Sequence, residues 1–268
     1  MRSLHLPVMI HRYVCAALLV CAVAGTAQAQ VTAGKIAFEP YSLRTYDGQV
    51  HAIELGKLIV PESRAKPSGP TVTIAFFRLK STSPTPGAPI VFLMGGPGIP
   101  ATVMAPIPPY WDLFDALRSS GDVILLDQRG LGMSTPKLDC PPLKESLDTA
   151  LLTSHAALVS AYAQGVADCA GHWRGKGVDP RAYSDAAIAD DIDDIRGALG
   201  VPRVSILGFS YGTRLAMGFA RRHPNRLERV VLQGPTDADL GYHISLQHDS
   251  LLARVAGLAA TDSATAPF

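Results

Sequence analysis

The chain has 268 residues, of which 47% are hydrophobic and 18% charged, so it can bury one sizeable core and is not disordered. Its 24 basic and 23 acidic residues give a formal net charge of +1 and are spread along the chain. This balance gives no electrostatic footprint for nucleic acid or an anionic membrane, and a small or neutral molecule is the expected partner. The oligomeric state is left open.

The N-terminal segment has the organisation of an export signal. Arginines precede the apolar run 13–24, and the small residues Ala27 and Ala29 follow it. The run is too short to span a bilayer, which argues against a membrane anchor. We therefore expect a signal peptide at 1–29, a mature chain starting at Gln30, and export to the periplasm or the extracellular space without membrane attachment after cleavage.

Removal of the signal peptide would leave Cys140 and Cys169 as the mature cysteines. In an oxidising compartment they could form a disulfide, although the sequence leaves two unpaired thiols open. Neither cysteine has the spacing of a metal ligand or a neighbouring histidine that would make it a nucleophile.

The next segments predict an α/β fold. β-rich composition marks opening strands at 34–44, 50–60 and 71–79. Continuous apolar runs at 89–94 and 122–126 are bounded by glycine-rich turns, as expected of strands buried on both faces. A mostly parallel sheet flanked by helices is therefore expected.

An insertion is expected at about 135–183, where prolines are frequent and no strand signal is present. It contains both mature cysteines, and its composition predicts a loop and a short helix around 150–170. A crossover helix then follows, capped by Ser184 or Asp185 and ending at Gly200.

That crossover helix carries Asp190, Asp191, Asp193 and Asp194. Since they mostly lie on the face away from the isoleucines, we interpret them as a solvated face and not as a metal site.

The segment 203–220 predicts a strand, a sharp turn and a helix, with Gly208-Phe-Ser-Tyr-Gly212 at the turn. At such an elbow a strained backbone exposes the serine, and the glycines allow strand and helix to approach. Ser210 is therefore the candidate nucleophile, although an ordinary turn is the alternative. A short buried strand at 229–234 and a helix near 244–258 are expected to follow.

Two further motifs follow predicted strands. Gly95-Gly-Pro-Gly98 frees backbone N–H groups, so Gly96 and Tyr211 are the candidate oxyanion-hole donors. Asp127 and Arg129 could be catalytic, but an acid and an arginine at a strand end more often form a buried bidentate pair, which we expect here.

These three motifs, in this order, resemble those of the proline iminopeptidase and tripeptidyl aminopeptidase family of α/β-hydrolases. The resemblance covers about 90–234 well and implies a secreted serine hydrolase, most simply an exopeptidase acting on small peptides through an acyl-enzyme on Ser210. Met94 stands where proline iminopeptidases usually carry histidine. This departure, with the signal peptide and the insertion, is nearer the secreted tripeptidyl aminopeptidase branch.

A serine nucleophile also needs an acid and a histidine, which in this fold follow it on later loops. Asp237, Asp239, His243 and His248 are the nearby candidates. We expect instead that the chain is truncated, with a core at 30–241, the start of the cap region at 242–268, and the acid and histidine beyond it. An esterase with the same core and an inactive binding remnant are the alternatives.

No pattern in the sequence indicates a cofactor or a metal. There is no glycine-rich dinucleotide motif on a first strand, no phosphate-binding loop and no pair of histidines at helical spacing.

Overall fold

The computed structural model describes residues 34–141, 143, 154–236 and 245–262. The expected signal peptide at 1–29 lies outside the described residues. None of the described helices is both long and apolar enough to cross a membrane.

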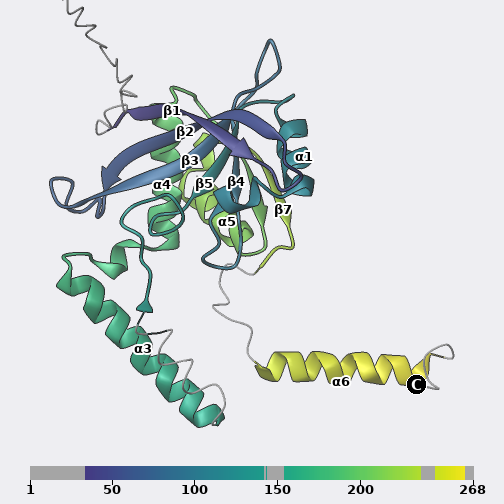
Figure 1. Cartoon of the computed structure of the whole chain (residues 1–268). Helices are drawn as coiled ribbons and strands as arrows, with labels where there is room; N and C mark the ends of the chain where they lie inside the picture. Colours follow the sequence, from purple (N-terminus) through teal and green to yellow (C-terminus); the bar gives the residue numbers. More distant parts are fainter. Residues whose placement is uncertain (1–33, 142, 144–153, 237–244, 263–268) are drawn as a thin grey trace, which may run out of the picture.

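The centre of the fold is a seven-stranded mixed sheet with the strand order β1-β2-β3-β5-β4-β6-β7 (Figure 1). Neighbouring strands from β1 to β5 along this order pair antiparallel, whereas β5, β4, β6 and β7 are mutually parallel. The expected α/β class and the parallel core are confirmed. The strands are β1 (Ile36–Arg44), β2 (Val50–Pro61), β3 (Thr71–Leu79), β4 (Ile90–Leu93), β5 (Val123–Asp127), β6 (Val204–Phe209) and β7 (Leu227–Gln233).

Helices cover both faces of the central strands. The α-helices are α1 (Pro108–Leu117), α3 (His155–Gly175), α4 (Asp185–Ala198), α5 (Tyr211–Arg222) and α6 (Ser245–Thr261). The short 3-10 helices are η1 (Ala101–Met104), η2 (Pro180–Ala182) and η3 (Pro224–Arg226).

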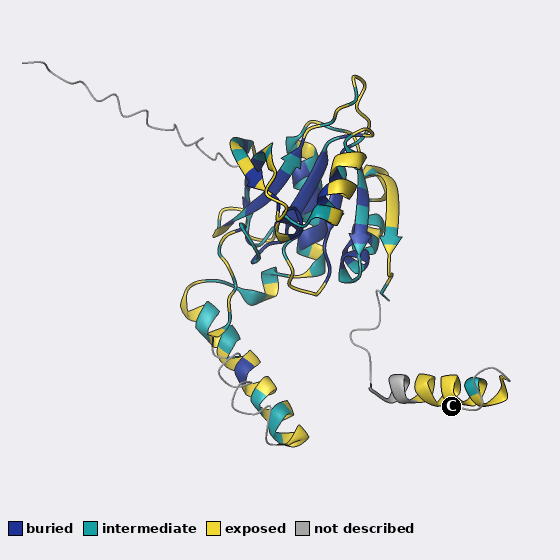
Figure 2. Ribbon diagram, turned by 45° about the vertical axis from the view of Figure 1, so that its right-hand side comes forward, coloured by how far each residue is buried: buried dark blue, intermediate teal, exposed yellow. Residues whose placement is uncertain are grey.

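The core is divided by the sheet into two apolar clusters (Figure 2). On one face, Ile192 of α4 and Phe219 of α5 pack with Ile206. On the other face, Phe114 of α1 packs against Phe92, with ring centroids 4.9 Å apart. Strands β4, β5 and β6 lie between these two layers, so both of their faces are packed. In open α/β sheets, ligands bind at the carboxyl ends of such strands.

The crossover helix begins as its sequence predicts. The Ser184 side chain accepts a hydrogen bond from the Ala187 N–H at 3.3 Å, which caps the first turn of α4. Gly200, two residues past the end of α4, has a positive φ of 72°, a conformation that glycine adopts without strain.

Strand β7 corrects an expectation. The sequence predicts a short buried strand at 229–234, but Val230 and Val231 are 40% and 59% exposed. On the α1 side, a hollow of about 1120 Å³ extends over β6 and β7 and is lined by Leu207, Val231 and Leu117 among others. The predicted strand is present, but the predicted burial is wrong, because α1 lines the far side of this hollow and does not pack on Val231 of β7.

The segment between β5 and α4 also differs from expectation. Instead of a short helix near 150–170, it holds the 21-residue helix α3, which extends away from the sheet (Figure 1). Only Gly165 of α3 is buried. Helix α6 confirms the helix expected near 244–258 and also lies apart from the sheet.

Candidate active site

Ser210 lies between β6 and α5, at the end of one of the central strands. Its φ is 52° and its ψ is −122°, and it is the single non-glycine residue with positive φ in the described part of the chain. Such a conformation costs on the order of 1–3 kcal/mol and persists only where the surroundings fix it. The strained elbow that the sequence predicts is therefore present.

The glycines on either side of Ser210 are required by close packing. A Cβ atom added at Gly212 would overlap the carbonyl oxygen of Leu93 in β4. One added at Gly208 would lie 2.7 Å from the carbonyl oxygen of Gly212. Strand, elbow and helix thus approach each other more closely than any side chain at these positions would permit.

Hydrogen bonds hold the backbone of Ser210 on both sides. Its N–H donates to the carbonyl oxygen of Gln233 at 2.8 Å. Its carbonyl oxygen accepts from the N–H of Thr213 at 2.9 Å and from Thr213 Oγ1 at 2.6 Å. The Thr236 N–H donates to Thr213 Oγ1 at 3.0 Å, so the segment after β7 is attached to the elbow.

The glycine turn after β4 lies directly against this elbow. A Cβ atom added at Gly95 would be 2.8 Å from Ser210 Cβ and 3.1 Å from the backbone nitrogen of Tyr211. The next residue, Gly96, has a φ of 115°, which other residues rarely adopt. The structure therefore brings together the two segments expected to form the oxyanion hole. That the Gly96 and Tyr211 N–H groups are the donors stays a prediction.

Asp127 has the structural role that we expected, but its hydrogen-bond partners do not include Arg129. Its carboxylate accepts hydrogen bonds from the Thr102 N–H at 3.0 Å, Thr102 Oγ1 at 2.7 Å and the Met133 N–H at 2.8 Å. Burial raises the pKa of Asp127, and these hydrogen bonds only partly oppose that shift. The carboxylate ties η1 and the 128–134 loop to the end of β5.

Arg129 pairs with Asp191, so the predicted Asp127–Arg129 pair was wrong. Its Nε and Nη2 donate to the two Asp191 carboxylate oxygens at 2.7 and 2.6 Å. Its Nη1 also donates to the carbonyl oxygens of Glu62 and Ala182, each at 2.8 Å. This buried bidentate pair joins four segments of the chain.

The same contact corrects the interpretation of the aspartates on α4. Asp191 is 1% exposed and also accepts from Arg64 Nη2 at 2.7 Å. From the sequence, we place these aspartates mostly on the face away from the isoleucines, but Asp191 lies one turn after Ile188 on the buried side. Within the described residues, no group of three or more histidine, cysteine or acidic residues is arranged to hold a metal.

The general base is not identified among the described side chains. His223 follows α5, whose 12 residues place it about 18 Å from the elbow, and its ring contacts Asp190 at 2.9 Å. His51 stacks on Trp111 with ring centroids 3.8 Å apart. The candidates Asp237, Asp239 and His243 lie outside the described residues, as does the side chain of His248.

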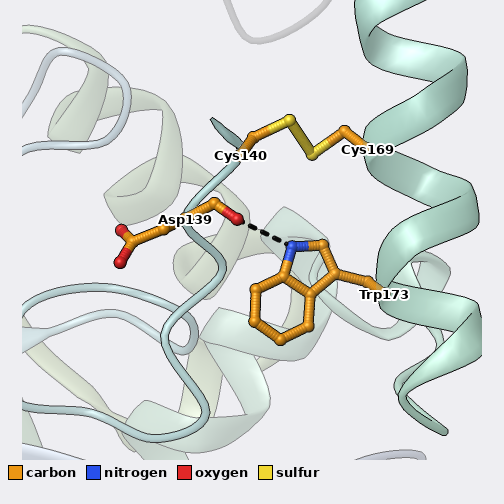
Figure 3. The surroundings of a disulfide bond; sticks show 4 residues. All are labelled: Asp139, Cys140, Cys169 and Trp173. Atoms are coloured by element: carbon orange, nitrogen blue, oxygen red, sulfur yellow. Dashed lines mark hydrogen bonds between the residues drawn. A yellow bond between two sulfur atoms is a disulfide. The ribbon is translucent and has the colours of Figure 1, made fainter. Parts of the chain in front are cut away.

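Cys140 and Cys169 are joined in a disulfide, with Cα atoms 5.5 Å apart (Figure 3). Beside it, Trp173 Nε1 donates to the carbonyl oxygen of Asp139 at 3.0 Å. These two contacts attach α3 to the segment that follows the 128–134 loop. The sequence made this pairing one of two alternatives, because it carries no information on the distance between the cysteines.

Comparisons with known proteins agree with this geometry. A family model described as alpha/beta hydrolase fold matches residues 88–261. The serine protease Hip1 of Mycobacterium tuberculosis is 29% identical over 191 residues, covering 68% of this chain and 36% of the relative. The tripeptidyl aminopeptidase of Streptomyces coelicolor is 28% identical over 218 residues, covering 74% and 38%.

Among solved structures, the proline iminopeptidase of Mycobacterium smegmatis is 21% identical, with a TM-score of 0.39, covering 65% of this chain and 42% of that one. The matches to Hip1 and to the tripeptidyl aminopeptidase span only 36% and 38% of those relatives' own length.

Proposed function

Because the chain belongs to the α/β-hydrolase family, we propose that it carries the nucleophile of a serine hydrolase of the aminopeptidase type. The observation that carries this proposal is the strained backbone of Ser210, with φ of 52°, at a strand-to-helix elbow packed against a glycine turn. The tripeptidyl aminopeptidase among the relatives favours peptides as substrates over other acyl compounds.

In the proposed reaction, Ser210 Oγ attacks the scissile carbonyl carbon and its proton passes to a histidine base. The developing oxyanion accepts hydrogen bonds from the N–H groups of Gly96 and Tyr211. The protonated histidine then gives its proton to the leaving amine, which leaves an acyl-enzyme ester on Ser210. Water, activated by the same histidine, hydrolyses that ester.

We further propose that the acid and the histidine come from segments C-terminal to β7. Thr236 supports this placement, because its hydrogen bond to Thr213 brings the chain after β7 to the elbow. The curated relatives are longer than this chain, which favours groups beyond Phe268 over the local candidates. In that arrangement, 30–241 is the core and 242–268 starts a cap region over the site.

Export is part of the proposal. The signal peptide proposed at 1–29 would deliver the protein to an oxidising compartment, and the Cys140–Cys169 disulfide fits such a compartment. N-terminal sequencing of the protein from periplasmic or culture fractions tests this. We expect Gln30 as the first residue, and an intact N-terminus starting at Met1 would contradict it.

Labelling with a fluorophosphonate probe tests the nucleophile, because Ser210 Oγ would displace fluoride from phosphorus. We expect labelling of the wild-type protein and none of Ser210→Ala, with Ser205→Ala on β6 as a matched control that keeps it. Comparison of the 268-residue chain with a form extended through any downstream coding sequence locates the base. Labelling of the shorter form would place the base within 237–268.

The substrate class is tested with paired substrates on the form that the probe is able to label, before any probe is added. Tripeptide and prolyl p-nitroanilides represent amides, and p-nitrophenyl acyl esters represent esters. Amide cleavage dependent on Ser210 supports the peptidase. Turnover of the esters alone would instead support an esterase with the same core, and labelling without any turnover would favour a binding remnant.

A further inference from the structure

The carboxylate of Asp185 bridges two side chains in the first turn of α5. Tyr211 Oη donates a hydrogen bond to Asp185 Oδ1 at 2.5 Å. Arg214 Nε donates to Asp185 Oδ2 at 2.7 Å. Since Tyr211 and Arg214 are three residues apart, they lie on the same face of the helix. One carboxylate thus attaches the first turn of α5 to the start of α4.

Asp185 is itself held firmly. It is the first residue of α4, directly after the capping Ser184. An acidic side chain here also interacts favourably with the helix dipole. Its side chain is 31% exposed and that of Arg214 is 28% exposed, so the contacts are half-buried rather than fully solvated. The bridge therefore connects two ordered elements.

The bridge matters for the candidate active site because Tyr211 is next to Ser210 in the sequence. Tyr211 follows the strained Ser210, and its backbone N–H is one of the two donors in the proposed oxyanion hole. The hydrogen bonds to Gln233 and Thr213 hold Ser210 from its own backbone. Asp185 instead contacts the next residue, Tyr211, through its side chain.

Other acidic residues on α4 make contacts that do not reach the elbow. Asp190 pairs with Arg222 in the last turn of α5. Asp193 pairs within its own helix, with Arg196 Nε at 2.6 Å. If Asp185 were an ordinary surface ion pair, Arg214 alone would serve as its partner. The hydrogen bond from Tyr211 Oη is therefore an additional contact that an ordinary ion pair would not require.

We propose that Asp185 is a positioning residue for the oxyanion hole, acting through the Tyr211 side chain on the Tyr211 backbone N–H. This inference rests on the proposed function, because it assumes that Ser210 forms an acyl-enzyme. A displacement of about 1 Å in such a donor is enough to slow the chemical step by one to two orders of magnitude.

The test compares five variants in the longest form of the protein that the fluorophosphonate probe labels. We expect Asp185→Ala and Tyr211→Phe each to slow fluorophosphonate labelling about tenfold, with the melting temperature little changed. The double variant should be no slower than either single variant, because both remove the same contact. Asp185→Asn, which keeps an oxygen acceptor for Tyr211, should recover most of the rate. Asp193→Ala is the matched control and should label at the wild-type rate.

A second readout does not depend on activity. The Thr213 N–H donates to the carbonyl oxygen of Ser210, so its hydrogen exchange reports on the order of the elbow. We expect exchange about tenfold faster in Asp185→Ala and Tyr211→Phe, and unchanged exchange in Asp193→Ala.

The outcomes separate the two proposals. Wild-type exchange in Asp185→Ala would overturn the positioning role, whether or not the protein labels. Faster exchange with wild-type labelling would also overturn it, because the bridge would then be structural only. Equal losses in Asp185→Asn and Asp185→Ala would assign the effect to Arg214 and contradict the route through Tyr211. Absence of Ser210-dependent labelling in every form would refute the proposed function, and the exchange measurement would still decide whether Asp185 orders the elbow.

Discussion

Strands β6 and β7 lie side by side and run in parallel, and both have apolar sequences, yet they differ in environment. Residues of β6 alternate between buried and half-buried, because α4 and α5 cover one face and α1 approaches the other. Most of β7 is exposed, and in Figure 2 it is yellow beside the dark blue central strands. The same type of sequence thus forms a core strand in one place and an open edge in the next.

This difference shows what an apolar run predicts and what it does not. Val204 and Ile206 are buried because helices from distant parts of the chain pack on them. Val231 has equivalent apolar character but faces the hollow over β6 and β7. The run therefore predicts the strand, whereas the elements packed on its two faces decide whether it is buried. The elbow is at the covered strand, where its strain can be maintained.

The largest change in stability is expected from a comparison of two ion pairs, one buried and one at the β7 edge. Arg129→Leu leaves the buried carboxylate of Asp191 without its main partner and should lower the free energy of unfolding by about 3–5 kcal/mol. Arg203 and Glu228 form a pair at the β6–β7 edge, with side chains 55% and 40% exposed. Arg203→Leu should change stability by at most about 1 kcal/mol. Urea denaturation measures both, and equal losses would refute the contrast between centre and edge.

The next test truncates one side chain on each strand. Ile206 is 1% exposed, and Ile206→Ala should cost about 2–5 kcal/mol, because it removes methyl groups from the core and leaves a cavity. Val231→Ala should change stability by less than about 0.5 kcal/mol. Thermal unfolding of the two variants checks this. A large loss at Val231 would mean that this face is covered in solution.

Two glycines on α5 sharpen the comparison at the elbow. Gly212→Ala forces a methyl group against the carbonyl oxygen of Leu93 and should destabilise the protein by about 1–3 kcal/mol. Gly218 has open space around a built Cβ atom, so Gly218→Ala should be neutral or stabilise by up to about 1 kcal/mol. A gain in stability at both positions would show that helix propensity outweighs close packing at Gly212 and would refute the expected clash with Leu93.

The smallest change in stability is expected for the ion pair between Asp190 and Arg222 in the last turn of α5. Burial raises the pKa of Asp190, but hydrogen bonds from Arg222 and His223 and the charge of Arg64 more than offset this and hold the pKa below its usual value. A lowered pKa stabilises the folded state above the unfolded-state pKa, and this stabilisation is lost as the pH falls through the folded-state pKa.

Arg222→Gln should therefore cost about 0.5 kcal/mol at pH 7, and less at pH 3. Denaturation curves at the two pH values check this difference. A larger loss at the acidic pH would contradict the assigned direction of the pKa shift.

Much of the fold was predictable because the signals are local. The opening strands, the crossover helix capped by Ser184 and the elbow at Ser210 follow from alternation, capping and glycine spacing in neighbouring residues. Each of the three motifs that indicate the family is also a short local pattern, and their order is read directly from the sequence.

The remaining features depend on residues far apart in the sequence. Arg129 pairs with Asp191 across 62 positions. Helical spacing from Ile188 places Asp191 on the buried side of α4, but no local pattern identifies Arg129 as its partner. The contact of Asp185 with Tyr211, 26 positions away, could not be predicted from local patterns either. The helix dipole already accounts for an acidic residue at the start of a helix, so nothing in the sequence pointed to a second role for Asp185.

The open edge of β7 affects how the protein behaves at high concentration. β7 is the last strand in the sheet order, and within the described residues no strand pairs with its outer side. The N–H and C=O groups along that side are a template for any extended chain, including a strand from a second copy. Because Val230 and Val231 add apolar surface to this template, the β7 edge is the place in the described sheet where strand addition is expected when the protein is concentrated.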